Sequence, residues 1–468
     1  MAMDATSSAA FTVLIRASSL PTSAILKAFL LALTTACLLQ TLRRPRQQRT
    51  RKPTAPIPPG PAQWPVVGSL PEMLLNKPAF RWIHHIMKEL GTDIACVKLG
   101  GVHVIPVTSP AIAREVLRSR GYRNAVLSPH GDQWRKMRRV LAAEVVSSRH
   151  RWLAGKRADE ADNITGYVYN IVTAARSSGG AVDVRHVARH YCGNVIRRLV
   201  FNRRYFGEPQ PDGGPGPLEA QHVDAVFASL GLLYAFCVSD YLPWLRGLDL
   251  DGHEKKVKEA NRIVNELHDM VIDERWRQWK SGERHEPEDF LDVLITLTGT
   301  DGKPLLTIEE VKAQSQDMTF VAVDNPSNAV EWAMSEMANR PEMANRPEML
   351  EKAAAELDAV VGRGRLVQEH DIPRLGYLKA CIREALRLHP VAPFNVPHVA
   401  LADATVAGYR VPKGSHVILS HIGLGRNPAV WDDPLRFDPD RHLALAHASL
   451  CSTPLPPRQR RWNRGTEA

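Results

Sequence analysis

The sequence predicts a mainly α-helical protein with small β-sheets, of the α+β class, and three observations support this. The chain has 468 residues, enough for one large buried core or two ordinary domains. Its 44% of hydrophobic and 24% of charged residues are typical of a globular protein rather than a disordered one. In the long segments apolar residues recur every three or four positions, as on one face of a helix, whereas strand-like runs are short.

Residues 1–42 are predicted to form an N-terminal membrane anchor. The most apolar run there is 24–39, which only Lys27 interrupts. Because about 20 residues are needed to cross a bilayer, neighbouring apolar residues must extend the run. Six basic residues follow within Arg43–Lys52, and positive charge on that side predicts a cytosolic body. A cleaved signal peptide, the alternative, would carry its positive charge before the apolar run.

Residues 43–65 are predicted to be a basic and proline-rich hinge. Clustered prolines in Pro53–Pro65 form a stiff, extended spacer, which suits a link between an anchor and a large body. An ordinary proline-rich linker is the alternative. The body is then expected to span 66–443, and 444–468 to be a tail of different character.

Within the body, helices are expected wherever the apolar spacing of three and four is sustained. These segments are Glu219–Phe236, Asp251–Gln278, Ile308–Val323, Asn328–Met337, Leu350–Val361 and Leu378–Leu388. The strand-like runs are Ile94–Leu99, His103–Val107, Thr405–Val411 and His416–Ser420. Since these runs lie near the two ends of the body, we expect a small sheet divided between those ends.

A perfect tandem repeat, EMANRP, occupies residues 336–341 and 342–347. Its prolines, Pro341 and Pro347, cannot both lie inside one regular helix without cost. A period of six residues matches no solenoid unit. The repeat is therefore interpreted as a duplication in a loop between two helices, without a function of its own.

Charge and cysteine content exclude two classes of function. The net charge of +10 lies mainly at the ends, because residues 1–52 hold eight basic residues against one acidic, and 444–468 hold four against one. The nearly neutral body does not fit a nucleic-acid-binding protein, which spreads a basic face over its fold. The six cysteines form no CxxC pair, so neither a zinc site nor a disulfide-rich scaffold is expected.

The strongest functional signals lie between residues 379 and 442. Glu384 and Arg387, in KACIREALRLHP, are three residues apart and so share a helix face. Alone, this spacing is that of many surface ion pairs. Two strand-like runs follow, and then WDDPLRFDPDRH, which contains Arg441.

In this order and spacing the motifs resemble those of the cytochrome P450 superfamily. Glu384 and Arg387 match its ExxR motif, and Arg441 matches the arginine of its PERF motif. The resemblance implies the cytochrome P450 fold, haem as cofactor, and NADPH–cytochrome P450 reductase as a partner. It also implies a buried Glu–Arg–Arg cluster beneath the haem, which is stable only if every charge is paired and hydrogen-bonded.

The resemblance assigns three more residues to the haem. Trp134 and Arg138, in GDQWRKMRR, match a WxxxR motif whose helix packs on haem and whose arginine pairs a propionate. A basic amphipathic helix is the alternative, because neighbouring residues are also charged. His398 lies where many relatives place a propionate-binding arginine or histidine, since an N–H donor suits a carboxylate. Without that context it would be an ordinary surface histidine.

The helix expected above the haem indicates one family within the superfamily. Most relatives carry there an acid followed by threonine, which relay protons to bound oxygen. This chain has Asp324 followed by Asn325, Pro326 and Ser327, which are the catalytic candidates, and the proline is expected to bend the helix. The string FVAVDNPSNAVEW resembles the plant amino-acid N-monooxygenases, which form aldoximes, and the tyrosine-using members of grasses in particular.

The chain departs from the superfamily where the iron ligand is expected. Relatives carry FxxGxRxCxG after the PERF region, and its cysteine thiolate ligates the iron. Residues 444–468 contain no such motif, and Cys451 is followed by prolines where a helix should begin, so no metal ligand is assigned. Relatives also have a longer segment, part of the pocket wall, between Arg120 and Gly121.

Three functions follow from these features. The resemblance implies an endoplasmic-reticulum monooxygenase that hydroxylates the nitrogen of an amino acid twice, with tyrosine favoured, and releases carbon dioxide and water. It would use O2 and electrons from NADPH. The missing cysteine motif favours a truncated remnant that cannot ligate haem iron. A regulatory protein that competes for the reductase is a third hypothesis, which no residue supports.

The anchor leads to a direct test of location. Residues 15–42 should hold the chain in the endoplasmic reticulum membrane with its body in the cytosol, because the basic cluster follows the apolar run. After extraction of microsomes with alkaline carbonate, the chain should stay in the pellet. Complete release into the supernatant would show that these residues do not anchor it.

Overall fold

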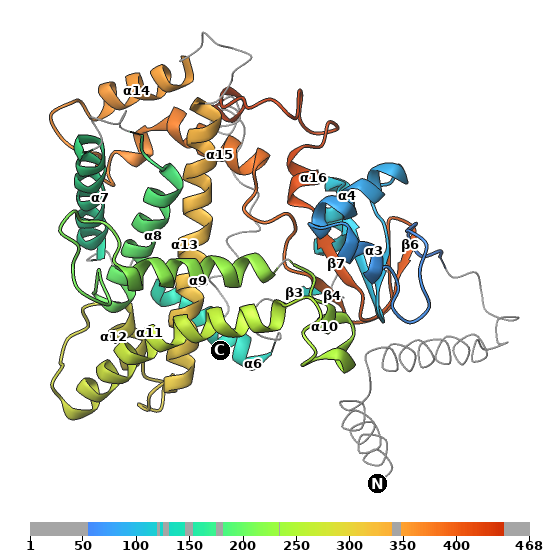
Figure 1. The fold of residues 1–468 in the computed structure, drawn as a ribbon, viewed down its shortest axis with the longest axis horizontal. Helices are drawn as coiled ribbons and strands as arrows, with labels where there is room; N and C mark the ends of the chain where they lie inside the picture. Colours follow the sequence, from blue (N-terminus) through green and yellow to red (C-terminus); the bar gives the residue numbers. More distant parts are fainter. Residues whose placement is uncertain are drawn as a thin grey trace, which may run out of the picture.

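A computed structural model describes residues 55–118, 122–124, 131–145, 153–174, 181–233, 235–338 and 348–443. The expected anchor, the first part of the hinge and the tail after 443 lie outside these residues. The larger part of the molecule consists of helices, and a small sheet lies at one side (Figure 1). Within the described parts of the chain, no helix has the length and apolar character that a membrane span requires.

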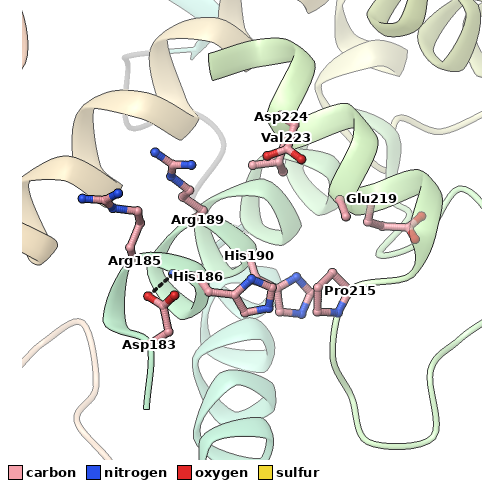
Figure 2. A pocket seen from close by; sticks show the side chains of 10 residues that line it. Asp183, Arg185, His186, Arg189, His190, Pro215, Glu219, Val223 and Asp224 are labelled. Atoms are coloured by element: carbon pink, nitrogen blue, oxygen red, sulfur yellow. Dashed lines mark hydrogen bonds between the residues drawn. The ribbon is translucent and has the colours of Figure 1, made fainter. Parts of the chain in front are cut away.

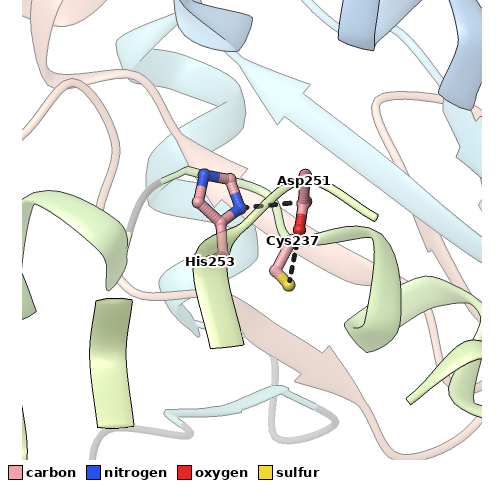
Figure 3. Close-up of side chains that lie close together, drawn as sticks. All are labelled: Cys237, Asp251 and His253. Atoms are coloured by element: carbon pink, nitrogen blue, oxygen red, sulfur yellow. Dashed lines mark hydrogen bonds and ion pairs between the residues drawn. The ribbon is translucent and has the colours of Figure 1, made fainter. Parts of the chain in front are cut away.

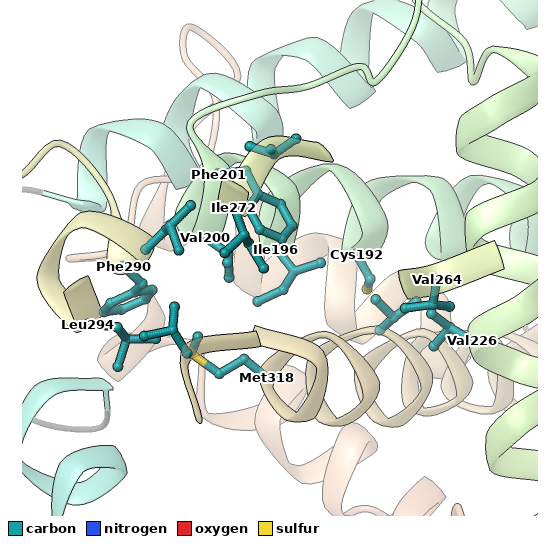
Figure 4. Packing of buried hydrophobic residues seen from close by; sticks show 14 of the residues in the cluster. Cys192, Ile196, Val200, Phe201, Val226, Val264, Ile272, Phe290, Leu294 and Met318 are labelled. Carbon is teal, nitrogen blue, oxygen red and sulfur yellow. The ribbon is translucent and has the colours of Figure 1, made fainter. Parts of the chain in front are cut away.

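The helical part is organised around one long helix, α13 (Ile308–Ala338). It packs against α8 (Val184–Phe201), α9 (Pro217–Leu233), α11 (His253–Ser281) and α15 (Gly376–Leu388). Figure 4 shows part of the apolar cluster between these helices, including Ile196, Val200, Val264, Ile272 and Met318. Burial of such side chains stabilises a fold by about 1.5–3 kcal/mol each, so this cluster holds α13 in the centre of the helical part.

The prediction of two helices on either side of residues 324–327 was wrong, because α13 continues through Pro326. Proline removes one backbone donor from a helix. The carbonyl that loses this donor is that of Ala322, four residues earlier. The side chains of Asn325 and Ser327 donate to the carbonyls on either side of it, Asn325 Nδ2 to Val321 O at 3.0 Å and Ser327 Oγ to Val323 O at 2.7 Å. Packing of α13 against its neighbouring helices keeps the helix continuous through the proline.

The other predicted helices are confirmed within a few residues as α9, α11, α14 (Glu348–Val360) and α15. The sequence analysis did not anticipate several more. These are α3 (Leu70–Leu75), α4 (Ala79–Glu89), α5 (Pro110–Arg118), η1 (Leu141–Val145), α7 (Ala154–Ala174), α8, α10 (Val238–Tyr241), η4 (Pro243–Leu245), α12 (Phe290–Thr296), η6 (Ile372–Arg374) and α16 (His421–Gly425). The helix expected around Trp134 and Arg138 is present as α6 (Asp132–Val140). Of the EMANRP repeat, residues 336–338 belong to α13, and 339–347 lie outside the described residues.

The two ends of the body meet in one five-stranded sheet. Its order is β1 (Val97–Leu99), β2 (Val102–Val107), β7 (His416–Leu419), β4 (His398–Ala400) and β3 (Tyr122–Asn124). Strands β2 and β7 are parallel, with Val104 opposite His416, whereas the other pairs are antiparallel. The expected sheet is thus confirmed, and its halves are joined side by side.

The run predicted as a single strand over Thr405–Val411 is a hairpin instead. It consists of β5 (Ala404–Val406) and β6 (Tyr409–Val411), paired with Val406 opposite Tyr409. The two loop residues, Ala407 and Gly408, have φ angles of 49° and 78°. Positive φ at both central residues is what a two-residue hairpin turn requires, and the apolar alternation does not reveal such a turn.

A pair of buried histidines joins α9 to α11. The Nε2 atoms of His222 and His268 lie 2.9 Å apart, and both side chains are almost fully buried. Their Nδ1 atoms have no hydrogen-bond partner among the described residues. Burial, and after it the charge of Arg197, lowers the pKa of His268 to about 3, and the pKa of His222 is also well below its usual value.

This pair should make the fold sensitive to acid. Both histidines stay neutral in the folded chain as the pH falls below about 6.5, whereas in the unfolded chain they take up protons. The free energy of unfolding should therefore fall by up to about 1.4 kcal/mol per pH unit for each histidine. Urea unfolding at pH 7 and pH 5 should show a smaller fall for the double variant His222→Leu/His268→Leu. Equal falls in variant and wild type would refute this role; His285→Leu, at an exposed position, is the control.

Candidate active site

Glu384 on α15 is fully buried, and its carboxylate accepts hydrogen bonds from α15 itself and from residues 438–442. Arg387 binds both of its oxygens at 2.7 Å. Arg441 Nε lies 3.0 Å from Oε1, and His442 Nε2 lies 2.9 Å from Oε2. The backbone N–H of Asp438 donates to Oε1 at 2.9 Å. The structure thus brings together the three residues that the ExxR and PERF resemblances selected, and it adds His442.

Both arginines also reach backbone carbonyls. Arg387 donates to the carbonyls of Gly425 and Pro434 at 2.6 and 2.7 Å, and to that of Arg436 at 3.0 Å. Arg441 Nη1 donates to the carbonyl of Asp432 at 2.9 Å. Hydrogen bonds from the two guanidinium groups therefore fix the backbone of residues 425–442, and both groups form ion pairs with Glu384. Asp432, Pro434 and Arg436 belong to no helix or strand, so regular backbone hydrogen bonding does not supply donors to their carbonyls.

The glycine at 425 is required by a close approach of two backbones. A Cβ atom at that position would lie 2.2 Å from the carbonyl oxygen of Arg387, a distance that real structures do not tolerate. The absence of a side chain allows α16 to end directly against α15, where the Arg387 guanidinium reaches it.

The electrostatic balance of the cluster favours an ionised carboxylate. Burial by itself raises the pKa of Glu384, but the hydrogen bonds from Arg387, the Asp438 N–H and His442 outweigh it and leave the pKa below its usual value. The carboxylate is therefore charged at neutral pH, as two neighbouring guanidinium groups require.

The catalytic candidates Asp324, Asn325, Pro326 and Ser327 lie in the middle of α13. Burial raises the pKa of Asp324, although the side-chain amide of Asn328, which donates to it at 2.7 Å, and the charge of Arg189 oppose the shift. Asn325 and Pro326 are exposed, and Ser327 is buried. A half-buried carboxyl beside exposed polar atoms can hold a proton and pass it on.

One acidic residue of this helix face was missed by sequence reasoning. Asp317 lies seven residues, about two helical turns, before Asp324, and so shares its face. Burial raises the pKa of Asp317 to about 6. Between the two acids Val321 keeps 59% of its surface exposed. The seven-residue spacing between Asp317 and Asp324 could have predicted that the two acids share a helix face. The sequence analysis considered only the acid at position 324 and therefore missed Asp317.

The three residues expected at the haem periphery lie on other elements. Trp134, half-buried, and Arg138, exposed, belong to α6, which Lys136 ties to Glu310 near the start of α13 at 2.7 Å. Glu310 precedes Asp324 by fourteen residues, or about 21 Å along the helix. His398 begins β4, and burial lowers its pKa. Between described residues, no hydrogen bond or ion pair joins Arg138 to His398 or either of them to residues 324–327.

A separate pocket of about 200 Å³ lies between the first halves of α8 and α9 (Figure 2). Arg185, His186 and Arg189 line it from α8, and Glu219 and Asp224 from α9. Because its walls carry both charges and Arg185 is already paired with Glu331, it selects no ligand by charge. One residue of its lining, Arg189, also acts through its charge on the pKa of Asp324.

Comparison with known proteins agrees with this arrangement. The sequence profile described as Cytochrome P450 matches residues 58–448. The chain belongs to the cytochrome P450 family. A zebrafish cytochrome P450 solved with progesterone has the same fold, with a TM-score of 0.60 and 24% identity, over 79% of this chain and 85% of that one.

Three relatives within the family are amino-acid N-monooxygenases. A tyrosine N-monooxygenase of Sorghum bicolor is 68% identical, over 95% of this chain and 84% of that protein. Valine N-monooxygenase 1 of Manihot esculenta is 52% identical, over 83% and 73%. A phenylalanine N-monooxygenase of Arabidopsis thaliana is 49% identical, over 87% and 81%. The predicted fold class and the predicted family are therefore confirmed.

The family implies haem, and the described residues offer an apolar surface for its ring but no suitable ligand for its iron. The exposed apolar surface at Val321 on the central helix suits a flat apolar ring. The described cysteines do not suit an axial thiolate: burial raises the pKa of Cys96, Cys192 and Cys381 to about 11, 12 and 11. The fourth, Cys237, lies before α10, outside this site. Cys451 lies outside the described residues.

The Glu384 cluster leads to a test of stability. Glu384→Ala should lower the free energy of unfolding by about 3–5 kcal/mol, because it leaves buried guanidinium charge unpaired. Urea unfolding of the full chain in detergent would measure this. The control is Glu259→Ala on α11, where the ion pair with Arg262 is exposed and should leave the midpoint unchanged. An equally small effect at both positions would mean that the Glu384 cluster contributes no net stability.

Proposed function

We propose that this chain is an aldoxime-forming amino-acid N-monooxygenase with tyrosine as its favoured substrate. The observation that carries the proposal is the 68% identity to the Sorghum bicolor tyrosine enzyme, against 52% and 49% to the valine and phenylalanine enzymes. The reaction would hydroxylate the amino nitrogen twice, and loss of carbon dioxide and water would then leave the aldoxime. Electrons would come from NADPH through a partner reductase.

Several residues would contribute to haem binding and to proton transfer. Haem, when bound, supplies the activation of oxygen. Trp134, Arg138 and His398 are proposed to hold its periphery, where cationic and N–H groups suit propionates. Asp324, with its raised pKa, is proposed to hold a proton near the reacting nitrogen, and Asn325 and Ser327 to shape the helix around Pro326.

The iron ligand has to come from residues after 443. The Glu384 cluster would hold the approach to that ligand, since it shapes the segment ending at His442. Because the printed tail lacks FxxGxRxCxG, the second candidate function is a remnant that keeps the scaffold and cannot ligate iron. Both candidates take residues 66–443 as the cytochrome P450 body, and they differ in whether the iron receives a thiolate ligand.

The proposed location is the endoplasmic reticulum membrane, with the body on the cytosolic side. An apolar surface near the start of the body supports this. Leu74 and Leu75 of α3 and Trp244, Leu248 and Leu250 after α10 are exposed, and Leu75 keeps 85% of its surface in solvent. The two segments rest on one shared apolar cluster, which includes Met73 and Leu245. A membrane surface is a suitable partner for such exposed apolar residues.

Restoring the missing motif should restore the chemistry. The two candidates predict different results for the chain as it stands: the remnant shows no thiolate-type band in the reduced carbon monoxide spectrum and forms no aldoxime, whereas the enzyme shows both. With residues 444–468 replaced by a family-type tail containing FxxGxRxC, the band should appear. With the family segment also restored between Arg120 and Gly121, tyrosine should be turned over in the presence of a plant reductase.

Controls separate the two candidate functions. Assays with phenylalanine, tryptophan, valine and isoleucine should give less aldoxime than the assay with tyrosine. The same tail with its cysteine replaced by alanine should show neither band nor product. A thiolate band from the printed chain would refute the remnant. A repaired chain that binds haem but oxidises only carbon in other substrates would refute the N-monooxygenase.

A further inference from the structure

Three side chains with metal-binding atoms meet outside the active site, between α9 and α11. Cys237 precedes α10, Asp251 lies before α11, and His253 is the first residue of α11. One ligand atom from each lies within 4.8 Å of the others. Figure 3 shows the His253 imidazole and the Cys237 thiol both next to the Asp251 carboxylate. Sequence analysis expected no zinc site because it looked for paired cysteines, and this cluster contains only one.

The chain geometry presents the three groups to one point. His253 Nδ1 lies 2.9 Å from Asp251 Oδ2, and Cys237 Sγ lies 3.7 Å from Oδ1. Gly252 stands between two of the three residues with a φ of 70°, a left-handed conformation that glycine adopts without strain. The turn at Gly252 thus allows residues on both sides of it to face Cys237.

One ring nitrogen of the cluster is close to a partner without being hydrogen-bonded to it. His253 Nδ1 is buried and lies 2.9 Å from Asp251 Oδ2 as an ion pair, but it has no hydrogen bond with a described residue. The side chains of His253 and Asp251 keep only 12% and 7% of their surfaces exposed. A buried ring nitrogen without a hydrogen bond is costly, and coordination of a cation would satisfy it.

We propose that Cys237, Asp251 and His253 bind a zinc ion, with water as the fourth ligand. Thiolate, imidazole and carboxylate together are the ligand set of zinc, which takes four ligands tetrahedrally. At usual zinc–ligand lengths the ligand atoms lie about 3.4–3.6 Å apart. The distances from Asp251 to His253 Nδ1 and to Cys237 Sγ, 2.9 and 3.7 Å, lie on either side of that range, and all three ligand atoms lie within 4.8 Å. Small side-chain rotations would therefore complete the site.

The charge balance of binding is simple. The hydrogen bond from the Val238 N–H and the charge of His253 outweigh burial and keep the pKa of Asp251 below its usual value, so it is already a carboxylate. Burial raises the pKa of the Cys237 thiol, so this group is protonated before binding. Zinc would replace the thiol proton, forming one Zn–S bond, and would bind His253 as the neutral imidazole, so the thiol proton and any proton on His253 Nδ1 pass to solvent.

A bound ion would fasten the segment between residues 237 and 253. Its two ends would be joined through the metal, and the segment carries the exposed Trp244, Leu248 and Leu250. Without metal, the Asp251 carboxylate alone joins the ends, by accepting the Val238 N–H at 2.9 Å. The alternative role of the cluster is that tether, with Cys237 as an ordinary small residue.

The test uses the full chain in detergent, stripped with a chelator and then titrated with zinc or cobalt. We expect one zinc per chain by elemental analysis, counted separately from iron. Cobalt should give a near-ultraviolet thiolate charge-transfer band. Cys237→Ser and His253→Gln should lose the band and bind zinc at least about tenfold more weakly. The control His285→Gln, at an exposed position beyond the far end of α11, should behave as wild type.

Hydrogen exchange of the wild-type chain provides a second measurement that needs no variant. Zinc should slow exchange in residues 237–253 relative to the metal-free chain, and circular dichroism should show that each variant is folded. Failure to bind zinc, a band that persists in Cys237→Ser, or exchange that zinc does not change would each overturn the site. None of these outcomes bears on haem or on aldoxime formation.

Discussion

Burial of the Glu384 carboxylate is the constraint on which this part of the molecule depends. Removing a charge from water costs several kcal/mol, and only complete pairing and hydrogen bonding offset that cost. Here the partners come from α15 itself and from residues 438–442, more than fifty positions later. The segment between them must therefore fold back onto α15, and its carbonyls in turn satisfy the remaining guanidinium donors.

The same constraint extends to the central helix. Helix α15 packs against α13, and directly after α15 His389 stacks on Trp332 of α13, with ring centroids 3.8 Å apart. His389 also lies 2.7 Å from Glu336, in the last turns of α13. The helix with Asp324 is thus tied to the charged cluster by packing and by a polar contact. A change at either place should be felt at the other.

The charged cluster and the apolar core are both formed by the body of the molecule. Among the described residues, the hydrogen bonds of Glu384 lie within residues 384–442, and the apolar core around α13 is formed with α8, α9, α11 and α12. The residues that mark the chain as a cytochrome P450 therefore lie largely in this body.

The sequence by itself determined the helical class and the helices α9, α11, α14 and α15, because apolar periodicity is a local property. It also selected Glu384, Arg387 and Arg441, through the resemblance of their motifs to those of the family. Only the tertiary structure decided that α13 runs through Pro326, that residues 404–411 form a hairpin, and that His442 joins Glu384. It also decided that Cys237, Asp251 and His253 share one point. These features depend on packing and on backbone conformation between segments, for which a linear pattern carries no signal.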